Sequence, residues 1–168
     1  MTVRLERPGD AGAIRAVAAA AFEQPDEADL VDALRESGDA VLSVVAEEDG
    51  RIVGHVLFSR LTIHGARGEI VAALALAPMA VVPERQRQGV GTALLTGALR
   101  ECRARGERIV IVLGHPEFYP RFGFSHERAS RLDSEYQCDA FMALELEAGA
   151  LQGLAGRVEY AAPFRRFA

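Results

Sequence analysis

Two arginines and two glutamines precede a pair of glycines in the segment VVPERQRQGVG, residues 81–91, and apolar side chains at helical spacing follow. The first turn of a helix has backbone N–H groups without intrahelical partners, and the helix dipole adds partial positive charge there. Gly89 and Gly91 would leave those N–H groups uncovered. Arg85 and Arg87 add positive charge beside them. The segment therefore predicts a site for a phosphate or pyrophosphate group.

The glycine spacing alone leaves the identity of the ligand open. A Walker phosphate loop requires a lysine after its last glycine, and the chain contains no lysine. A Rossmann dinucleotide site requires a third glycine, and Leu94 stands at that position. Close packing of the helix on a sheet would also explain the two glycines without any ligand. A phosphate site and a packing role both remain possible at this point.

Strands and helices that can position this segment alternate along the chain. Period-two and buried apolar patterns predict strands over residues 2–7, 40–48, 51–63, 69–82, 107–114 and 140–147. Helices are predicted over residues 8–22, 27–37 and 90–104. Asp49-Gly50 predicts a tight hairpin turn because both residues accept positive φ. In the segment HPEFYPRFGF, Pro116 can open a helix that Pro120 keeps short. The alternation predicts a single α/β or α+β domain.

Composition narrows the class of protein. The 168 residues include 49% hydrophobic side chains, enough for a packed core, and the net charge of −5 argues against a general nucleic-acid binder. Cys102 and Cys138 have no metal-ligand or redox spacing, so we expect free thiols in a reducing compartment and no metal. Charges in the first ten residues exclude a secretory signal, and the longest apolar run is too short for a membrane span. We expect a cytoplasmic protein without membrane or nucleic-acid partners.

Two motifs together resemble one family. QRQGVG, residues 86–91, matches the Gln/Arg-x-x-Gly-x-Gly/Ala signature of the GNAT N-acetyltransferase superfamily, and its flanks resemble the strand-loop-helix motif of that family. Downstream, FYPRFGF resembles the Tyr-x-x-x-Gly-Phe element, with Tyr119, Gly123 and Phe124 in register. The order and separation of the two motifs match the family. The resemblance extends over about residues 2–147 and is nearest to an uncharacterised bacterial branch.

The resemblance implies a fold and a domain organisation. The fold is α/β (α+β), with a mixed, mostly antiparallel central sheet of about seven strands flanked by helices. Two central strands, here residues 71–82 and 108–113, would splay apart. We expect an acetyltransferase domain over residues 1–147. Residues 148–168 would be a C-terminal tail or an extra strand that packs on the same domain.

The resemblance also implies acetyl-CoA as the acyl-donor substrate. Backbone groups of Met79 and Val81 would pair with the pantetheine amides as a strand edge does. The backbone N–H groups of residues 86–92, here called the glycine loop, would hold the pyrophosphate. The binding residues expected in that loop are Gln86, Arg87, Gln88, Gly89, Val90, Gly91 and Thr92. The side chains of Arg85 and Arg87 are alternatively an ordinary solvated surface.

The implied reaction is direct attack of a primary amine on the acetyl thioester in a ternary complex. Tyr119 has the position of the acid that protonates the leaving thiolate, and a buried structural tyrosine is the alternative. His115 is a candidate base or water-holding residue. The alternative for His115 is an exposed loop histidine or a polar contact to pantetheine. A backbone N–H near Val81 would stabilise negative charge on the carbonyl oxygen.

The general base and the acceptor are less defined. Glu69 is the only glutamate on the strand next to the acyl group, and Glu84 is expected to face the phosphate loop. His55 and His64 are expected on the sheet surface, with the acceptor pocket as the alternative. Four acidic residues join the first two helices and are expected to be solvated, with docking of a cationic acceptor as the alternative: Glu23, Asp26, Glu27 and Asp29.

Two other functions remain open. The chain could be a non-catalytic acyl-CoA sensor or interaction module, or an unrelated phosphate-ligand binder. The presence of Tyr119 and of the glycine pair favours the enzyme. The acceptor could be a small-molecule amine or a protein amine. The range of acyl chains that the site accepts is also open, and the chain could form a homodimer.

Overall fold

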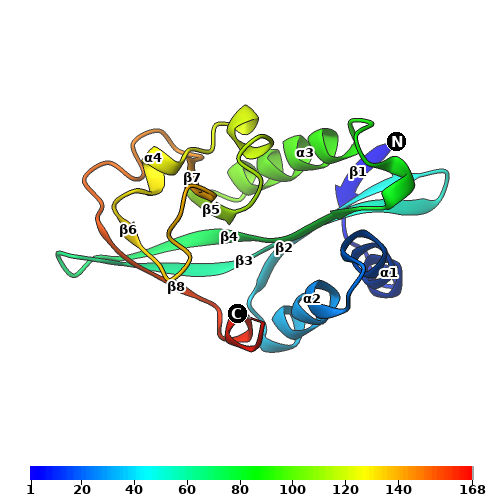
Figure 1. The fold of residues 1–168 in the computed structure, drawn as a ribbon, viewed down its shortest axis with the longest axis horizontal. Coiled ribbons are helices and arrows are strands. Elements are labelled where there is room, and N and C mark those ends of the chain that lie inside the picture. Colours follow the sequence, from blue (N-terminus) through cyan, green and yellow to red (C-terminus); the bar gives the residue numbers. More distant parts are fainter. Residues whose placement is uncertain (168) are drawn as a thin grey trace. The chain divides into compact units, whose positions relative to one another are not determined.

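The computed structural model describes residues 1–167 (Figure 1). The α-helices are α1 (Ala11–Phe22), α2 (Asp26–Ser37), α3 (Val90–Ala104) and α4 (His126–Ala129). The strands are β1 (Thr2–Leu5), β2 (Ala40–Glu48), β3 (Arg51–Gly65), β4 (Ile70–Val81), β5 (Ile109–Leu113), β6 (Leu132–Asp133), β7 (Phe141–Glu145) and β8 (Gly156–Tyr160). Short 3-10 helices are η1 (Pro83–Arg85), η2 (Tyr119–Phe122) and η3 (Ala162–Arg166).

The strands form an eight-stranded sheet in which hydrogen-bonded neighbours follow the order β1-β2-β3-β4-β5-β7. β8 pairs with β3 and with β6. The β1–β2, β2–β3, β5–β7 and β3–β8 pairs are antiparallel, whereas β4–β5 and β6–β8 are parallel. The mixed, mostly antiparallel sheet is therefore confirmed. It has one strand more than the expected number because β6 has only two residues, too few to show an alternating pattern.

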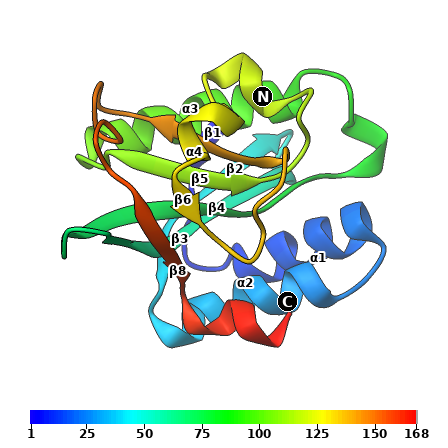
Figure 2. The ribbon, with the colours of Figure 1, turned by 60° about the vertical axis from the view of Figure 1, so that its left-hand side comes forward.

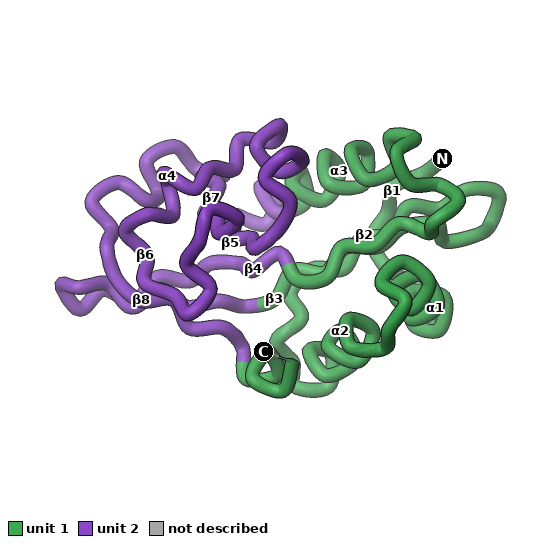
Figure 3. The backbone as a smooth tube through the Cα atoms, in the orientation of Figure 1, with its two compact units in different colours: residues 1–59, 77–101, 162–168 green, residues 60–76, 102–161 purple. Residues whose placement is uncertain are grey.

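The chain divides into two compact units, shown in different colours in Figure 3. Unit 1 consists of residues 1–59, 77–101 and 162–168, and unit 2 consists of residues 60–76 and 102–161. The glycine loop belongs to unit 1, and the FYPRFGF segment belongs to unit 2. The two motifs thus lie in different units.

In unit 1, α1 and α2 lie on one face of the strands and α3 lies on the other (Figures 1 and 2). Gly54 on β3 allows α3 to approach closely, since a Cβ there would lie 3.3 Å from Leu94 Cδ2 and from Val90 Cγ1. The apolar stripe predicted for α3 is buried, with relative exposures of 0–2% for Val90, Leu94, Leu95, Ala98 and Cys102. The beginning of α3 is thus fixed against the sheet.

Turns in unit 1 form where the sequence predicts them. Asp49 and Gly50 have φ of 52° and 76°, which the tight β2–β3 hairpin requires. Gly38 ends α2 with φ of 81°.

In unit 2, β5 pairs with β7 along its whole length, and residues 61–65 at the end of β3 pair with β8. The parallel pairing of β4 with β5 joins Leu74 to Val110 and Ala75 to Ile111, which lie in the first half of β4. This short ladder agrees with strands that diverge further along. One expectation is wrong here: Pro116 lies in a turn, and the short helix η2 begins later, with Pro120 in its first turn.

Both cysteines are free thiols. Cys102 is buried on α3, and burial raises the pKa of its thiol to about 12. Cys138 is exposed in the segment before β7. Over residues 1–167, the structure contains no helix with the length and apolar character needed to cross a membrane.

Candidate functional site

The glycine loop of unit 1 ends where α3 begins. The Ala93 N–H donates to the Gly89 carbonyl at 3.1 Å, so Gly89 immediately precedes the first helical turn. Gly89 has a φ of 85°, and a Cβ at this position would have no heavy atom within 4 Å. Glycine is therefore suited to this position by its backbone conformation rather than by space. Arg87 has a φ of 61°, an uncommon conformation for a residue with a side chain.

The loop offers a row of uncommitted hydrogen-bond donors. Throughout residues 1–167, no protein group accepts a hydrogen bond from the backbone N–H groups between Arg87 and Thr92. Three of these N–H groups, those of Val90, Gly91 and Thr92, belong to the first turn of α3. The dipole of the 15-residue helix adds positive potential at the same place. Such an arrangement matches an anionic group with several oxygen acceptors, as a pyrophosphate has.

Two glutamine side chains brace the loop. Gln86 Nε2 donates to the Val81 carbonyl at 2.9 Å, and Gln88 Nε2 donates to the Glu84 carbonyl at 3.0 Å. Both amide side chains are thus occupied with the backbone that precedes them. The sequence predicts these glutamines as binding residues. The backbone N–H of Gln88 is an available donor, whereas that of Gln86 donates to the Pro83 carbonyl at 3.3 Å.

The end of β4 presents a strand edge. The Val82 N–H donates to the Val53 carbonyl at 2.9 Å, so the backbone groups of Val82 point towards β3. Because successive residues of an extended chain direct their backbone groups to opposite sides, those of Val81 point away from β3. Met79, two residues earlier, has the same orientation in a regular strand. This geometry is compatible with the strand-edge role predicted for Met79 and Val81.

The charges around the loop differ from the expected arrangement. Arg85 is half-buried and pairs with Glu48 of β2 at 2.6 Å, so it is neither a solvated surface group nor a free cation. Glu84, which is expected to face the phosphate loop, pairs with Arg51 of β3 at 2.7 Å. A hydrogen bond to its own backbone and then Arg51 hold the pKa of Glu84 below its usual value. Arg87 is exposed, and its side chain has no partner within the described part of the chain.

In unit 2, Tyr119 is buried in an aromatic cluster, with an exposed fraction of 6%. Its ring makes edge contacts with Phe118 and Phe124, at centroid distances of 5.1 and 5.6 Å. Burial raises the pKa of Tyr119 to about 12, so the phenol is protonated at neutral pH. No hydrogen bond joins the Tyr119 hydroxyl to a described residue, and its oxygen is not fully buried. The hydroxyl oxygen is therefore partly accessible to solvent.

His115 lies four residues before Tyr119 and is exposed. Its carbonyl accepts hydrogen bonds from the N–H groups of Phe118 and Tyr119, at 3.1 and 3.3 Å, and so closes the turn that precedes the short helix η2. Its imidazole has no partner among residues 1–167. The structure thus gives His115 a defined backbone role and leaves its side chain available.

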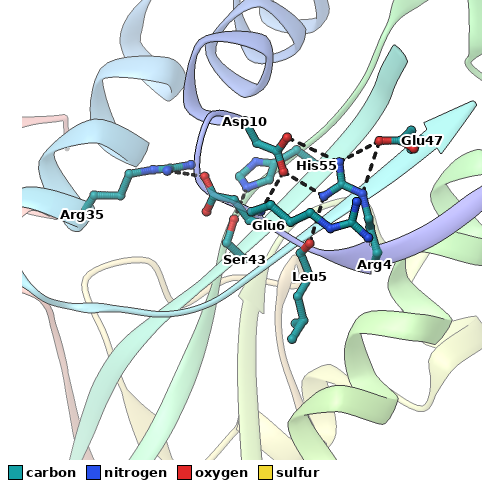
Figure 4. Close-up of polar contacts among 9 residues, drawn as sticks. Arg4, Leu5, Glu6, Asp10, Arg35, Ser43, Glu47 and His55 are labelled. Atoms are coloured by element: carbon teal, nitrogen blue, oxygen red, sulfur yellow. Dashed lines mark hydrogen bonds and ion pairs between the residues drawn. The ribbon is translucent and has the colours of Figure 1, made fainter. Parts of the chain in front are cut away.

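One expectation for the other histidines is wrong. His55 is not on the sheet surface: its exposed fraction is 1%, and its Nε2 lies 2.8 Å from Ser43 Oγ (Figure 4). Burial, and secondly the charge of Arg35, lower the pKa of His55 to about 3. Arg35 itself pairs with Glu6. His64 is half-buried, and its Nε2 lies 3.2 Å from a carboxylate oxygen of Glu159 on the paired strand β8.

The burial of His55 predicts a pH-dependent stability. Its folded pKa of about 3 lies below its ordinary value of 6.5, so below pH 6.5 the unfolded chain binds a proton that the folded chain does not. The free energy of unfolding should therefore fall on acidification, by up to about 1.4 kcal/mol per pH unit for this one proton. Denaturant titrations across this range should show a shallower slope for His55→Gln. His64→Gln is the control. An unchanged slope in His55→Gln would contradict the prediction.

Two of the four acidic residues near the link between the first two helices, Glu27 and Asp29, have side-chain partners within unit 1. Arg15 binds Asp29 at 2.7 Å and Asp32 at 2.8 Å, and Gln24 binds Glu27 at 2.9 Å. A pocket of about 310 Å³ lies on the α2 surface and is lined mainly by acidic residues of α2 and by two residues of the C-terminal segment: Asp29, Asp32, Ala33, Glu36, Arg166 and Phe167.

Comparison with known proteins agrees with the fold and with the motifs. Residues 2–126 match the sequence model of the family described as "Acetyltransferase (GNAT) domain". The uncharacterised N-acetyltransferase YhbS of Escherichia coli K12 is 37% identical over 172 residues, covering 99% of this chain and 100% of that protein. The chain therefore belongs to the GNAT acetyltransferase family.

Two solved structures extend the likeness to three dimensions. The E. coli YhbS structure in complex with CoA superposes with a TM-score of 0.90 at 35% identity, covering 99% of this chain and 93% of that one. A GNAT family acetyltransferase from Brucella melitensis in complex with acetyl-CoA gives a TM-score of 0.79 at 36% identity, with 97% of each chain covered. Both proteins are thus similar to this chain over nearly its whole length.

Proposed function

We propose that the chain transfers an acetyl group from acetyl-CoA to a primary amine by direct attack in a ternary complex. The observation that supports this most strongly is the row of free backbone N–H groups from Arg87 to Thr92 at the beginning of α3. Two similar proteins with CoA or acetyl-CoA in their structures support the same donor. The pyrophosphate of acetyl-CoA would accept hydrogen bonds from these N–H groups, and Arg87 would add an unpaired positive charge.

Pantetheine would extend from this loop along β4. Its amides would pair with the backbone of Met79 and Val81, whose hydrogen-bonding groups would point away from β3 in a regular strand. The N–H of Val81 or a neighbour would stabilise the oxygen of the acetyl carbonyl as it gains negative charge. Gln86 already binds the Val81 carbonyl, so this end of β4 is held before the substrate arrives.

The chemical step would form one bond and break one. The amine nitrogen attacks the acetyl carbon, the C–S bond breaks, and the electron pair leaves with the sulfur as a thiolate. Tyr119 would donate its phenolic proton or hydrogen bond to that sulfur. The amine loses a proton, for which the exposed imidazole of His115 is our candidate acceptor. The products are the acetylated amine and free CoA.

The first test is calorimetric titration of acetyl-CoA into the purified protein, followed by a screen of primary amines for thiol release. We expect saturable one-site binding and acetyl transfer to at least one amine. Simple nucleotides are the competitors: displacement by them at equal affinity would indicate a general phosphate-ligand site instead. Binding without thiol release for any amine would favour an acyl-CoA sensor. Absence of binding would overturn the proposal.

A further inference from the structure

Gly114 immediately follows β5, and its conformation does not explain why it is a glycine. Its φ is not in the left-handed region, so an alanine would be compatible with its backbone. Its N–H donates to the Ala140 carbonyl at 3.1 Å, which fixes this end of the strand in place. The reason for the glycine must therefore be sought in what lies beside it.

The neighbour of Gly114 is the ring of Tyr119. A Cβ at position 114 would lie 3.0 Å from Cδ2 and 3.3 Å from Cζ of that ring, and nearer still to Cε2, at a separation that real Cβ atoms do not show. The ring cannot easily yield, because Phe118 and Phe124 contact it by their edges at interplanar angles of 83° and 72°. The ring of Tyr119 thus occupies the space that a side chain at position 114 would fill.

We propose that Gly114 is a positioning residue that sets where the Tyr119 hydroxyl lies. This inference rests on the proposed function, in which that hydroxyl serves the leaving sulfur. A Cβ at position 114 would push the ring away from the end of β5 and move the hydroxyl at the far end of the ring with it. Displacement of a proton donor by about 1 Å is enough to lower a rate by about 10²-fold.

A double-mutant cycle tests the proposal with four proteins: wild type, Gly114→Ala, Tyr119→Phe and the double variant. Single-turnover thiol release from acetyl-CoA in a mixture of primary amines gives the rate, and calorimetry gives the acetyl-CoA affinity. We expect Gly114→Ala to lower the rate about 10²-fold in the wild-type background. In the Tyr119→Phe background, where no hydroxyl remains to be misplaced, the further loss should be about twofold or less. Acetyl-CoA affinity should stay unchanged throughout.

Near-ultraviolet circular dichroism reads the position of the ring without any reaction. The chain has three tyrosines and no tryptophan, so tryptophan bands do not overlap the tyrosine signal. The difference between the spectra of the wild type and Tyr119→Phe gives the contribution of Tyr119 to that signal. Gly114→Ala should change that contribution. Gly12→Ala on α1 is the matched control, because a Cβ there would meet no atom within 4 Å. Its rate and spectrum should remain those of the wild type.

Two results would overturn the positioning role. One is an unchanged tyrosine spectrum in Gly114→Ala. The other is an equal loss of rate in both backgrounds, which would mean that the substitution acts by general disruption. Wild-type protein that binds acetyl-CoA but releases no thiol with any amine would refute the proposed function instead. In that case, the spectrum still decides whether Gly114 fixes the ring.

Discussion

Tyr119→Phe is expected to lower turnover about 10²-fold, because it removes the one group that we propose to serve the leaving thiolate. The ring is 6% exposed and sits between Phe118 and Phe124, so phenylalanine keeps the packing and removes only the hydroxyl. Acetyl-CoA affinity should therefore change by about twofold at most. Steady-state kinetics and calorimetry on the same preparations measure both quantities.

The control for this substitution is Tyr136→Phe, in which the same atom is removed from a ring that packs on Tyr160. Its turnover should equal that of the wild type. Since the pKa of Tyr119 is raised to about 12, its protonated form should persist through the neutral and mildly alkaline range. Turnover of Tyr119→Phe equal to that of the wild type would remove Tyr119 from the mechanism.

Gly91→Arg is expected to weaken acetyl-CoA binding at least about 10²-fold, equivalent to about 2.7 kcal/mol. Gly91 is the second residue of α3, in the middle of the free N–H groups, and an arginine side chain there would occupy the volume that the pyrophosphate needs. Because the added charge is positive, a loss of affinity would report obstruction rather than repulsion. Calorimetric titration of acetyl-CoA measures the effect.

Thr96→Arg provides the matched control, because it adds the same side chain at an exposed position further along α3. Its affinity for acetyl-CoA should remain that of the wild type. Thermal unfolding of both variants separates loss of the site from loss of the fold. If folded Gly91→Arg bound acetyl-CoA as tightly as the wild type, the glycine loop would not be the pyrophosphate site.

Local features of the chain were predictable because they depend on neighbours in sequence. The positive φ of Asp49 and Gly50 and the buried stripe of α3 follow from residue type and spacing alone. The glycine loop could be placed at a helix beginning for the same reason. Motif spacing then indicated the family, which the family match and the similar proteins show.

Features that depend on distant residues were not predictable. Glu48 neutralises Arg85 from 37 positions away, and no local pattern marks that pair. The burial of His55 could have been suspected, since Val53 and Leu57 two positions to either side are apolar and share its face of the strand. Its Ser43 partner comes from another strand and needed the β2–β3 register. Gly114 and Tyr119 are only five residues apart, but nothing in the sequence indicates that the ring folds back against the glycine.

The two cysteines differ in a way that affects how the enzyme can be assayed. Cys102 is buried with a pKa of about 12 and should be inert to thiol reagents, whereas Cys138 is exposed and should react. A colorimetric reagent that detects released CoA will therefore also detect one protein thiol per chain. In single-turnover work, where the enzyme is at least equimolar with acetyl-CoA, that background is at least as large as the signal. Replacing Cys138 with serine would remove it, and the same exposed thiol offers a single attachment point for a fluorescent reporter.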